Sequence, residues 1–225
     1  CRPFGIRLLS IYGSTESSPH SLVRLNDTRE HTEETDGCAV DGVEIRVVDD
    51  ARHEVPHGQE GEEASRGPQV FVGYWGEPEM TARALDADGW YYSGDYCRTD
   101  SEGRYIRITG RKKDIIVRGG ENISSREVED IVLEYPGVRE AAVVAMPDER
   151  LGERSCACVS MRPGAPALHL TDLVAFFDGR RVAKYKFPEY LVVLDALPRT
   201  SSGKLQKFAL ARMVRERVAA GQPSD

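Results

Sequence analysis

Gly110-Arg111-Lys112-Lys113-Asp114 marks the place where this sequence changes its character. Before it, short stretches with alternating apolar and polar residues, such as residues 42–48, predict strands that are separated by Gly, Pro and Asp turns. After it, apolar runs predict strands that alternate with helices. The pattern therefore predicts two domains with a boundary near Lys113, namely residues 1–112 and residues 113–225.

The first domain is predicted to be rich in strands. Residues 42–48 alternate, and residues 69–75 form a second run of β-branched and aromatic residues. A short helix is expected over residues 78–85, and an extended segment over residues 104–109. Together these elements indicate a β-barrel-like subdomain.

The second domain is predicted to be a small α+β unit. A hairpin is expected around Gly119-Gly120. Ser124-Ser125-Arg126-Glu127 has the pattern of a capping box, in which a hydroxyl and a carboxylate satisfy the free amides of a helix start. The next helix should bury four residues at helical spacing: Val128, Ile131, Val132 and Tyr135. The remaining predicted elements are strands over 141–146 and 156–161, a helix from 171, a strand over 190–194 and a helix after 203.

Length and composition are those of an ordinary globular chain. Of the 225 residues 40% are hydrophobic and 30% charged, which excludes a disordered chain. No apolar run approaches the roughly 20 residues that cross a bilayer. The formal net charge of -7 argues against a general nucleic-acid binder, because affinity for a phosphate backbone needs dense Lys and Arg.

Cysteine and histidine form no metal-binding pattern. The five cysteines have no paired spacing of a disulfide framework, so a reducing, cytoplasmic location is expected. Cys156 and Cys158 are two apart in an apolar stretch, so both face one side of a strand and are expected to be buried thiols rather than zinc ligands. None of the five histidines has the H-E-x-x-H spacing, and most are expected at the surface.

Two stretches carry candidate chemistry. Tyr12-Gly13-Ser14-Thr15-Glu16 combines a ring that can cover a purine, a glycine that lets backbone approach closely, and a carboxylate that suits a hard cation. The alternative is an ordinary junction between a strand and a turn. Pro198-Arg199-Thr200-Ser201-Ser202-Gly203-Lys204 presents one lysine in a turn. It is no P-loop, because Pro198 stands where that motif needs Gly, and Leu205 where it needs Ser or Thr.

Two further motifs lie between these stretches: Tyr92-Ser93-Gly94-Asp95 and the segment 110–114. In residue type and order the four motifs resemble those of the AMP-forming adenylating enzymes, which include the acyl-CoA synthetases. The resemblance implies an α+β fold in which residues 1–112 end a large AMP-binding domain and residues 113–225 form a small mobile C-terminal domain. Residues such as 17–20 and 62–68 are most similar to bacterial short- and medium-chain fatty acyl-CoA synthetases.

The resemblance covers only the later half of the family pattern. The sequence has no Ser/Thr/Gly-rich phosphate loop that ends in Lys-Gly. The chain is therefore expected to be the C-terminal portion of a longer enzyme, and to be catalytically incomplete by itself.

A role for each motif residue follows from the resemblance. Lys204 would reach the substrate carboxylate and the α-phosphate, and Lys113 would be the hinge about which the small domain rotates between half-reactions. Gly119 and Gly120 would line the channel for the pantetheine of coenzyme A. The residues that would hold the nucleotide and its metal are Tyr12 on adenine, Gly13 where the backbone approaches the nucleotide closely, Thr15 at a phosphate, Asp95 on the ribose, Arg111 on ribose or phosphate, and Glu16 on Mg2+.

The activity that the resemblance implies is an acid-thiol ligase. It would use ATP and Mg2+ to convert a short- or medium-chain carboxylic acid into an acyl adenylate, and would then pass the acyl group to coenzyme A. No nucleic acid is expected as a partner. Two alternatives stay open: an adenylation domain that loads a carrier protein, and a noncatalytic nucleotide-binding or interaction module.

Overall fold

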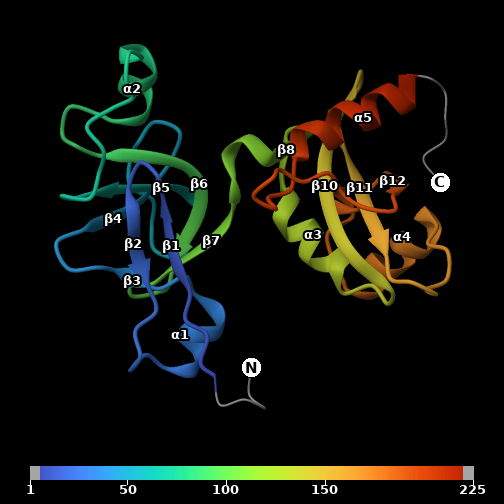
Figure 1. Cartoon of the computed structure of the whole chain (residues 1–225), viewed down its shortest axis with the longest axis horizontal. Helices are drawn as coiled ribbons and strands as arrows, with labels where there is room; N and C mark the ends of the chain where they lie inside the picture. The colour runs from blue at the N-terminus through green and yellow to red at the C-terminus, as the bar shows by residue number, and fades with distance from the viewer. Residues whose placement is uncertain (1–5, 220–225) are drawn as a thin grey trace. The chain divides into compact units, whose positions relative to one another are not determined.

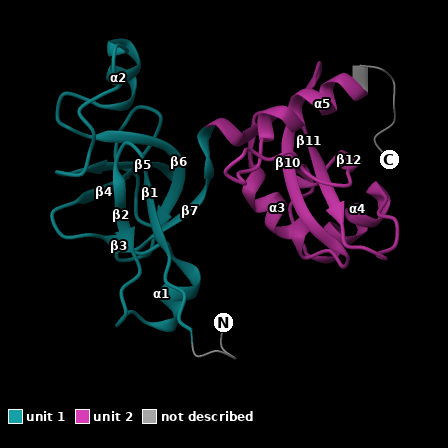
Figure 2. Cartoon of the chain, in the orientation of Figure 1, with its two compact units in different colours: residues 1–112 teal, residues 113–225 magenta. Residues whose placement is uncertain are grey.

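The computed structural model describes residues 6–219 of the chain. The chain divides into two compact units, residues 1–112 and residues 113–225 (Figures 1 and 2). The division falls within a 3-10 helix, η2 (Lys112–Asp114), that follows the last strand of the first unit. Each unit has buried apolar clusters of its own, so each has its own core.

The first unit contains two antiparallel sheets and two short helices (Figure 1). One sheet has the strand order β1-β2-β3 and the other the order β4-β5-β6-β7. A bridge between Cys38 and Tyr105 connects the two sheets, so the strand-rich unit takes the form of two linked antiparallel sheets. Its elements are β1 (Ile11–Ser14), β2 (Ser18–Leu22), α1 (Arg29–Glu34), β3 (Cys38–Ala39), β4 (Glu44–Val48), β5 (Gly61–Arg66), α2 (Pro78–Ala84), β6 (Tyr91–Thr99) and β7 (Ile106–Arg111).

The predicted strand over residues 69–75 is wrong, and the sequence-based prediction missed β5. Residues 69–75 form turns and irregular chain, in which Val72 and Trp75 are fully exposed. The strand is instead Gly61–Arg66, where the carboxylate residue Glu63 is completely buried. Because β5 pairs with β4 on one side and β6 on the other, small and polar side chains are enclosed there without any hydrophobic alternation.

The second unit is built on a mixed sheet of five strands (Figure 1). The long antiparallel pair of β10 and β11 forms its centre, and β12 runs parallel to β11. The hairpin of β8 and β9 joins the sheet at Gly152, the first residue of β11. Its elements are β8 (Ile115–Arg118), β9 (Glu121–Ser124), α3 (Ser125–Leu133), β10 (Val138–Asp148), β11 (Gly152–Met161), α4 (Leu170–Gly179), η3 (Lys184–Lys186), β12 (Tyr190–Val193) and α5 (Lys207–Ala219).

Alternate residues of β10 and β11 face two different cores. Val143 and Val159 belong to a core that also contains buried residues of α3 and α4. Cys156 and Cys158 belong to the opposite core, which Leu210 of α5 helps to close. The two thiols are therefore buried on one side of a strand, as predicted. The hydrogen bond with Cys158, together with burial, raises the pKa of Cys156 and keeps that thiol protonated.

Helix α3 begins at the predicted capping sequence. The hydroxyl of Ser124 accepts a hydrogen bond from the backbone amide of Glu127 at 3.3 Å. The carboxylate of Glu127 accepts from Nζ of Lys186 at 2.6 and 2.8 Å. The hydroxyl half of the capping box is confirmed, and the carboxylate links α3 to η3.

The core of the second unit can be tested at two phenylalanines. Phe177 is completely buried, so Phe177→Ala should lower the free energy of unfolding by about 3–5 kcal/mol, because it removes apolar contacts and leaves a cavity. Phe208, at 83% exposure, is the matched control, and Phe208→Ala should change that free energy by less than about 0.5 kcal/mol. Denaturant unfolding followed by circular dichroism measures both. Equal losses would contradict this placement of the core.

Candidate functional site

The turn between β1 and β2 carries the stretch Tyr12–Glu16. The pairing of the two strands shifts register between Tyr12 and Gly13. A Cβ atom on Gly13 would lie 2.2 Å from the carbonyl oxygen of Ser18, so only glycine fits this close approach between the strands. Beyond the shift Gly13 pairs with Pro19 and Ser14 with Ser18. The turn that follows leaves Thr15 exposed and Glu16 half-buried.

Asp95 brings three of the predicted site residues together. It lies in β6, directly after Gly94 with its φ of +72°, and is 8% exposed. Its Oδ2 accepts a hydrogen bond from the hydroxyl of Tyr12 at 3.0 Å, although the two residues are 83 positions apart. Its Oδ1 lies 3.1 Å from Nε of Arg111, its cross-strand partner in β7. The contact with Tyr12 also links the two sheets of the first unit.

The surroundings of Tyr12 keep its hydroxyl protonated. Burial raises the pKa of Tyr12 far above its ordinary value, and the negative charges of Glu63 and Asp95 act in the same direction. The hydroxyl is therefore a donor at every working pH, with Asp95 as its nearer acceptor and Glu63 Oε2 at 3.5 Å as the farther one. The ring meets the imidazole of His20 edge-on, with 5.1 Å between the centroids.

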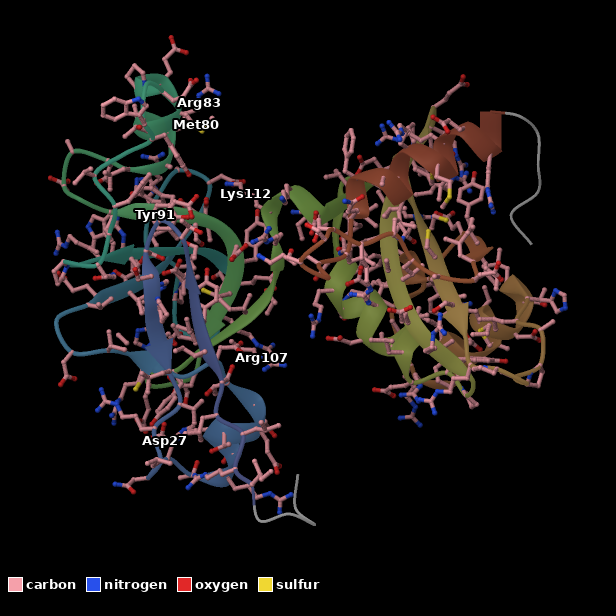
Figure 3. The ribbon with its side chains drawn as sticks, viewed as in Figure 1. Asp27, Met80, Arg83, Tyr91, Arg107 and Lys112 are labelled. Atoms are coloured by element: carbon pink, nitrogen blue, oxygen red, sulfur yellow. The ribbon has the colours of Figure 1, made fainter. Side chains whose placement is uncertain are left out.

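Glu16 is held by a segment that was predicted to be a strand. The hydroxyl of Tyr74 donates to Glu16 Oε1 at 2.9 Å, and the amide of Phe71 donates to the Glu16 carbonyl at 2.7 Å. Phe71 also meets Tyr91 edge-on; Figure 3 labels Tyr91 in the first unit. Residues 69–75 thus pack against the turn that carries the candidate metal ligand.

The carboxylate of Glu16 suits Mg2+ as a single protein ligand. Within residues 6–219 there is no cluster of three or more His, Cys, Asp or Glu side chains that could hold a metal ion. Mg2+ usually takes one or two carboxylates and completes its shell with substrate phosphates and water. One half-buried carboxylate beside an exposed hydroxyl, that of Thr15, fits this chemistry.

Lys204 lies in a tight turn of the second unit, ahead of α5. The amide of Thr200 donates to the Lys204 carbonyl at 2.8 Å, and the Lys204 amide donates to Thr200 Oγ1 at 3.1 Å. Gly203 provides the positive φ of +83° that this turn needs. The side chain of Lys204 is exposed and pairs with none of the described carboxylates, whereas Lys207 binds Glu129 at 2.7 Å. Lys204 is an available cation on an ordered backbone.

Lys113 is the first residue of the second unit. The residue before it, Lys112, is labelled in Figure 3 and pairs with Asp50 at 2.8 Å and with Glu62 at 3.0 Å. Burial lowers the pKa of Lys112, but the hydrogen bonds that it donates to both carboxylates outweigh this effect, so the net pKa is raised. Lys112 is thus fastened to the first unit, while Lys113 is exposed.

Gly119 and Gly120 form the turn of the predicted hairpin between β8 and β9, which the structure confirms. Their φ values of +59° and +92° are those that a two-residue primed turn requires. The amide of Gly119 donates to the Leu151 carbonyl at 2.7 Å, whereas a Cβ atom on Gly120 would meet nothing within 4 Å. The contact of these glycines with coenzyme A stays a prediction.

Two residues beside the site were missed by the sequence-based prediction. His20 and Glu63 are completely buried, with 3.1 Å between Nε2 and Oε1. Most histidines were expected at the surface. His53, His57 and His169 are exposed and His31 is half-buried, whereas His20 is completely buried. No periodicity could reveal a pair that is 43 positions apart in polar sequence. The sequence signal that connected residues 17–20 with residues 62–68 was their similarity to the same bacterial acyl-CoA synthetases.

Comparison with known proteins places this chain in a family. A family model for AMP-binding enzymes matches residues 2–75, and one for the AMP-binding enzyme C-terminal domain matches residues 127–204. The chain belongs to the AMP-binding enzyme family. It is 64% identical over 218 residues to a medium-chain fatty-acid--CoA ligase of Escherichia coli (strain K12). The aligned residues make up 97% of this chain and 38% of that enzyme.

Solved structures share the fold. The ATP-bound MatB from Rhodopseudomonas palustris matches with a TM-score of 0.87 at 34% identity, over 94% of this chain and 41% of that one. The amide bond synthetase McbA from Marinactinospora thermotolerans matches with a TM-score of 0.81 at 32% identity, over 91% of this chain and 42% of that one. The predicted α+β fold is confirmed. The chain spans about two fifths of the length of the relatives that it matches.

No helix within the described residues is long and apolar enough to cross a membrane.

Proposed function

We propose that the whole protein is an acyl-CoA ligase that adenylates a short- or medium-chain fatty acid with ATP and passes the acyl group to coenzyme A. The observation that carries the proposal is that Tyr12 and Arg111 both contact the carboxylate of Asp95. It occurs in a chain that is 64% identical to a medium-chain fatty-acid ligase. Residues 1–112 would end the large AMP-binding domain, and residues 113–225 would form the small one.

The first unit supplies the binding of the nucleotide. The ring of Tyr12 covers the adenine, and Asp95 accepts hydrogen bonds from the ribose hydroxyls, since its oxygens have lone pairs beyond those that Tyr12 and Arg111 use. Arg111, which is half-exposed, forms an ion pair with the carboxylate of Asp95 and directs positive charge toward the phosphates. The hydroxyl of Thr15 donates to a phosphate oxygen. Mg2+ held at Glu16 would neutralise phosphate charge.

Lys204 of the second unit supplies the positive charge that the first half-reaction needs. An oxygen of the substrate carboxylate attacks the α-phosphorus, the bond to the bridging oxygen breaks, and pyrophosphate leaves. Negative charge accumulates on the bridging oxygen and on the other oxygens of the α-phosphate in the transition state, where the ammonium of Lys204 stabilises it more than in the ground state. The absence of an ion-pair partner among the described residues leaves Lys204 available for this role.

The second half-reaction uses the other face of the small domain. Rotation about Lys113 would remove Lys204 and bring the hairpin of Gly119 and Gly120 to the pantetheine channel. The thiol of coenzyme A then gives up its proton to water and its sulfur attacks the acyl carbonyl. AMP leaves with the electron pair of the broken bond between the acyl carbon and the phosphate oxygen. The reduced thiols of Cys38, Cys97, Cys156 and Cys158 support a cytoplasmic location.

An ATP–pyrophosphate exchange assay of the whole protein with a panel of acids tests the proposal. Exchange should depend on a short- or medium-chain acid, and Asp95→Ala should raise KM for ATP by about 10- to 100-fold, because a charge-assisted bond to the ribose is lost. The exposed Asp88 is the matched control, and Asp88→Ala should leave KM unchanged. Acyl transfer to a carrier protein or an amine, without transfer to coenzyme A, would contradict the proposed acceptor.

A further inference from the structure

We propose that the buried pair of His20 and Glu63 positions the nucleotide site by holding the hydroxyl of Tyr12, and through it the carboxylate of Asp95. The inference rests on the proposed nucleotide binding and adds two residues to it. Neither His20 nor Glu63 touches the nucleotide in this scheme, so both are positioning residues.

Two irregularities of the strands aim these side chains at one another. The β1-β2 ladder shifts register directly after Tyr12, and the β5-β6 ladder shifts register across Glu63. Such bulges re-aim side chains and are over-represented beside active sites. Glu63 Oε1 lies 3.1 Å from Nε2 of His20, and its Oε2 lies 3.5 Å from the Tyr12 hydroxyl. One carboxylate therefore bridges the imidazole and the candidate adenine-binding tyrosine.

The contacts of His20 favour its charged form. Nε2 faces the carboxylate of Glu63, and Nδ1 lies 3.0 Å from the carbonyl oxygen of Ser18, which can only accept, and 3.0 Å from the hydroxyl of Ser17, which can accept or donate. Only the imidazolium can donate to the Glu63 carboxylate and to the Ser18 carbonyl at the same time. Burial lowers the pKa of His20, but the hydrogen bond and charge of Glu63 and the Ser18 carbonyl outweigh it, so the net pKa is raised.

The charge on His20 decides which carboxylate accepts the hydrogen bond of the Tyr12 hydroxyl. The hydroxyl of Tyr12 lies between Glu63 and Asp95 and has one hydrogen to donate. An uncompensated Glu63 would compete for that hydrogen and would repel Asp95. With Glu63 neutralised by His20, the shorter bond of 3.0 Å goes to Asp95, which then stays oriented between Tyr12 and Arg111. The pair of His20 and Glu63 thus fixes Tyr12 and Asp95, the two residues proposed to contact the nucleoside.

Site-directed variants of the whole protein test this inference. Glu63→Gln and His20→Gln keep the approximate shape and a hydrogen-bonding group but remove the charge. Each should raise KM for ATP by about tenfold while kcat changes by less than about threefold, because nucleoside contacts act equally in the ground and transition states. His53 is the matched control, since it forms an exposed pair with Asp49 at 3.6 Å, and His53→Gln should change neither constant.

Coupling to Tyr12 separates positioning from a merely structural role. In the Tyr12→Phe background, which lacks the hydroxyl, Glu63→Gln should raise KM no more than about twofold further, because the two changes break one chain of contacts. Loss of folding stability alone would make the effects on KM independent of Tyr12. Equal effects of Glu63→Gln with and without the hydroxyl would overturn the inference.

The dependence on pH gives a second readout. The groups that face His20 are Glu63 of β5 and Tyr12 of β1, with Asp95 behind Tyr12. KM for ATP should rise as pH increases through the raised pKa of His20, because Glu63 then loses its compensating charge. His20→Gln should abolish that rise, and an unchanged pH profile would overturn the inference.

Failure of the proposed function is distinguishable from failure of this inference. If no acid supports exchange in the unaltered protein, the ligase proposal fails. Calorimetric titration with ATP alone then replaces KM, with the same variants and the same coupling to Tyr12→Phe. If Glu63→Gln does not fold, as judged by circular dichroism, His20→Gln and the pH profile of the unaltered protein decide the outcome.

Discussion

Lys204→Ala in the whole protein is expected to lower the rate of acyl-adenylate formation by about 100- to 1000-fold, the range for removal of one group that stabilises developing charge. Thioester formation from supplied acyl adenylate should keep most of its rate. The reason is that Lys204 is proposed to act on the adenylation face only, where its ammonium, which pairs with no carboxylate of residues 6–219, meets the α-phosphate. Separate assays of the two half-reactions, with the purified variant, measure the difference.

Lys184 provides the control for this experiment. It is an exposed lysine in η3 of the same unit, and Lys184→Ala should leave both half-reactions unchanged. Circular dichroism of both variants excludes loss of the fold. Equal loss of both half-reactions in Lys204→Ala would contradict the assignment of two separate faces to the small domain.

Lys113→Pro should have the opposite effect on the two half-reactions. Proline fixes φ near -65° and restricts the preceding residue to extended conformations, so it removes freedom where the chain leaves the first unit. That preceding residue is Lys112, which Asp50 and Glu62 hold in place. We expect adenylation to survive and thioester formation to fall on the order of tenfold, because a gating rotation is blocked.

The comparison with Lys113→Ala isolates the backbone effect. Alanine removes the same side chain but leaves φ free, so both half-reactions should stay within about twofold of the unaltered protein, as for most surface substitutions. Single-turnover measurements of each step show which one has changed. Normal rates for both steps in Lys113→Pro would mean that Lys113 is not the hinge.

Local signals predicted much of the fold. Pro78 at the start of α2, the glycine pair between β8 and β9, and the hydroxyl of Ser124 at the start of α3 each act within a few residues of their own position. Such short-range effects can be predicted from sequence, because the atoms that interact are neighbours along the chain. The placement of Cys156 and Cys158 on the same side of β11 followed in the same way from the period of a strand.

The failure at residues 69–75 has a physical cause. That run has the composition of a strand, yet Phe71 and Tyr74 pack against the turn that carries Glu16 and form no ladder. The polar stretch Gly61–Arg66 became the central strand because β4 and β6 enclose it. Propensity for strand depends on the partners that a segment finds, and those partners are far away in sequence.

The sequence by itself determined which chemical groups this protein has: the motif residues from Tyr12 to Glu16, Asp95, Arg111 and Lys204, in an order typical of one family. Only the tertiary structure decided which of them meet. The contact of Tyr12 with Asp95 spans 83 positions, and that of His20 with Glu63 spans 43. Both depend on the pairing of strands and on two bulges, which follow from long-range packing that no local pattern encodes.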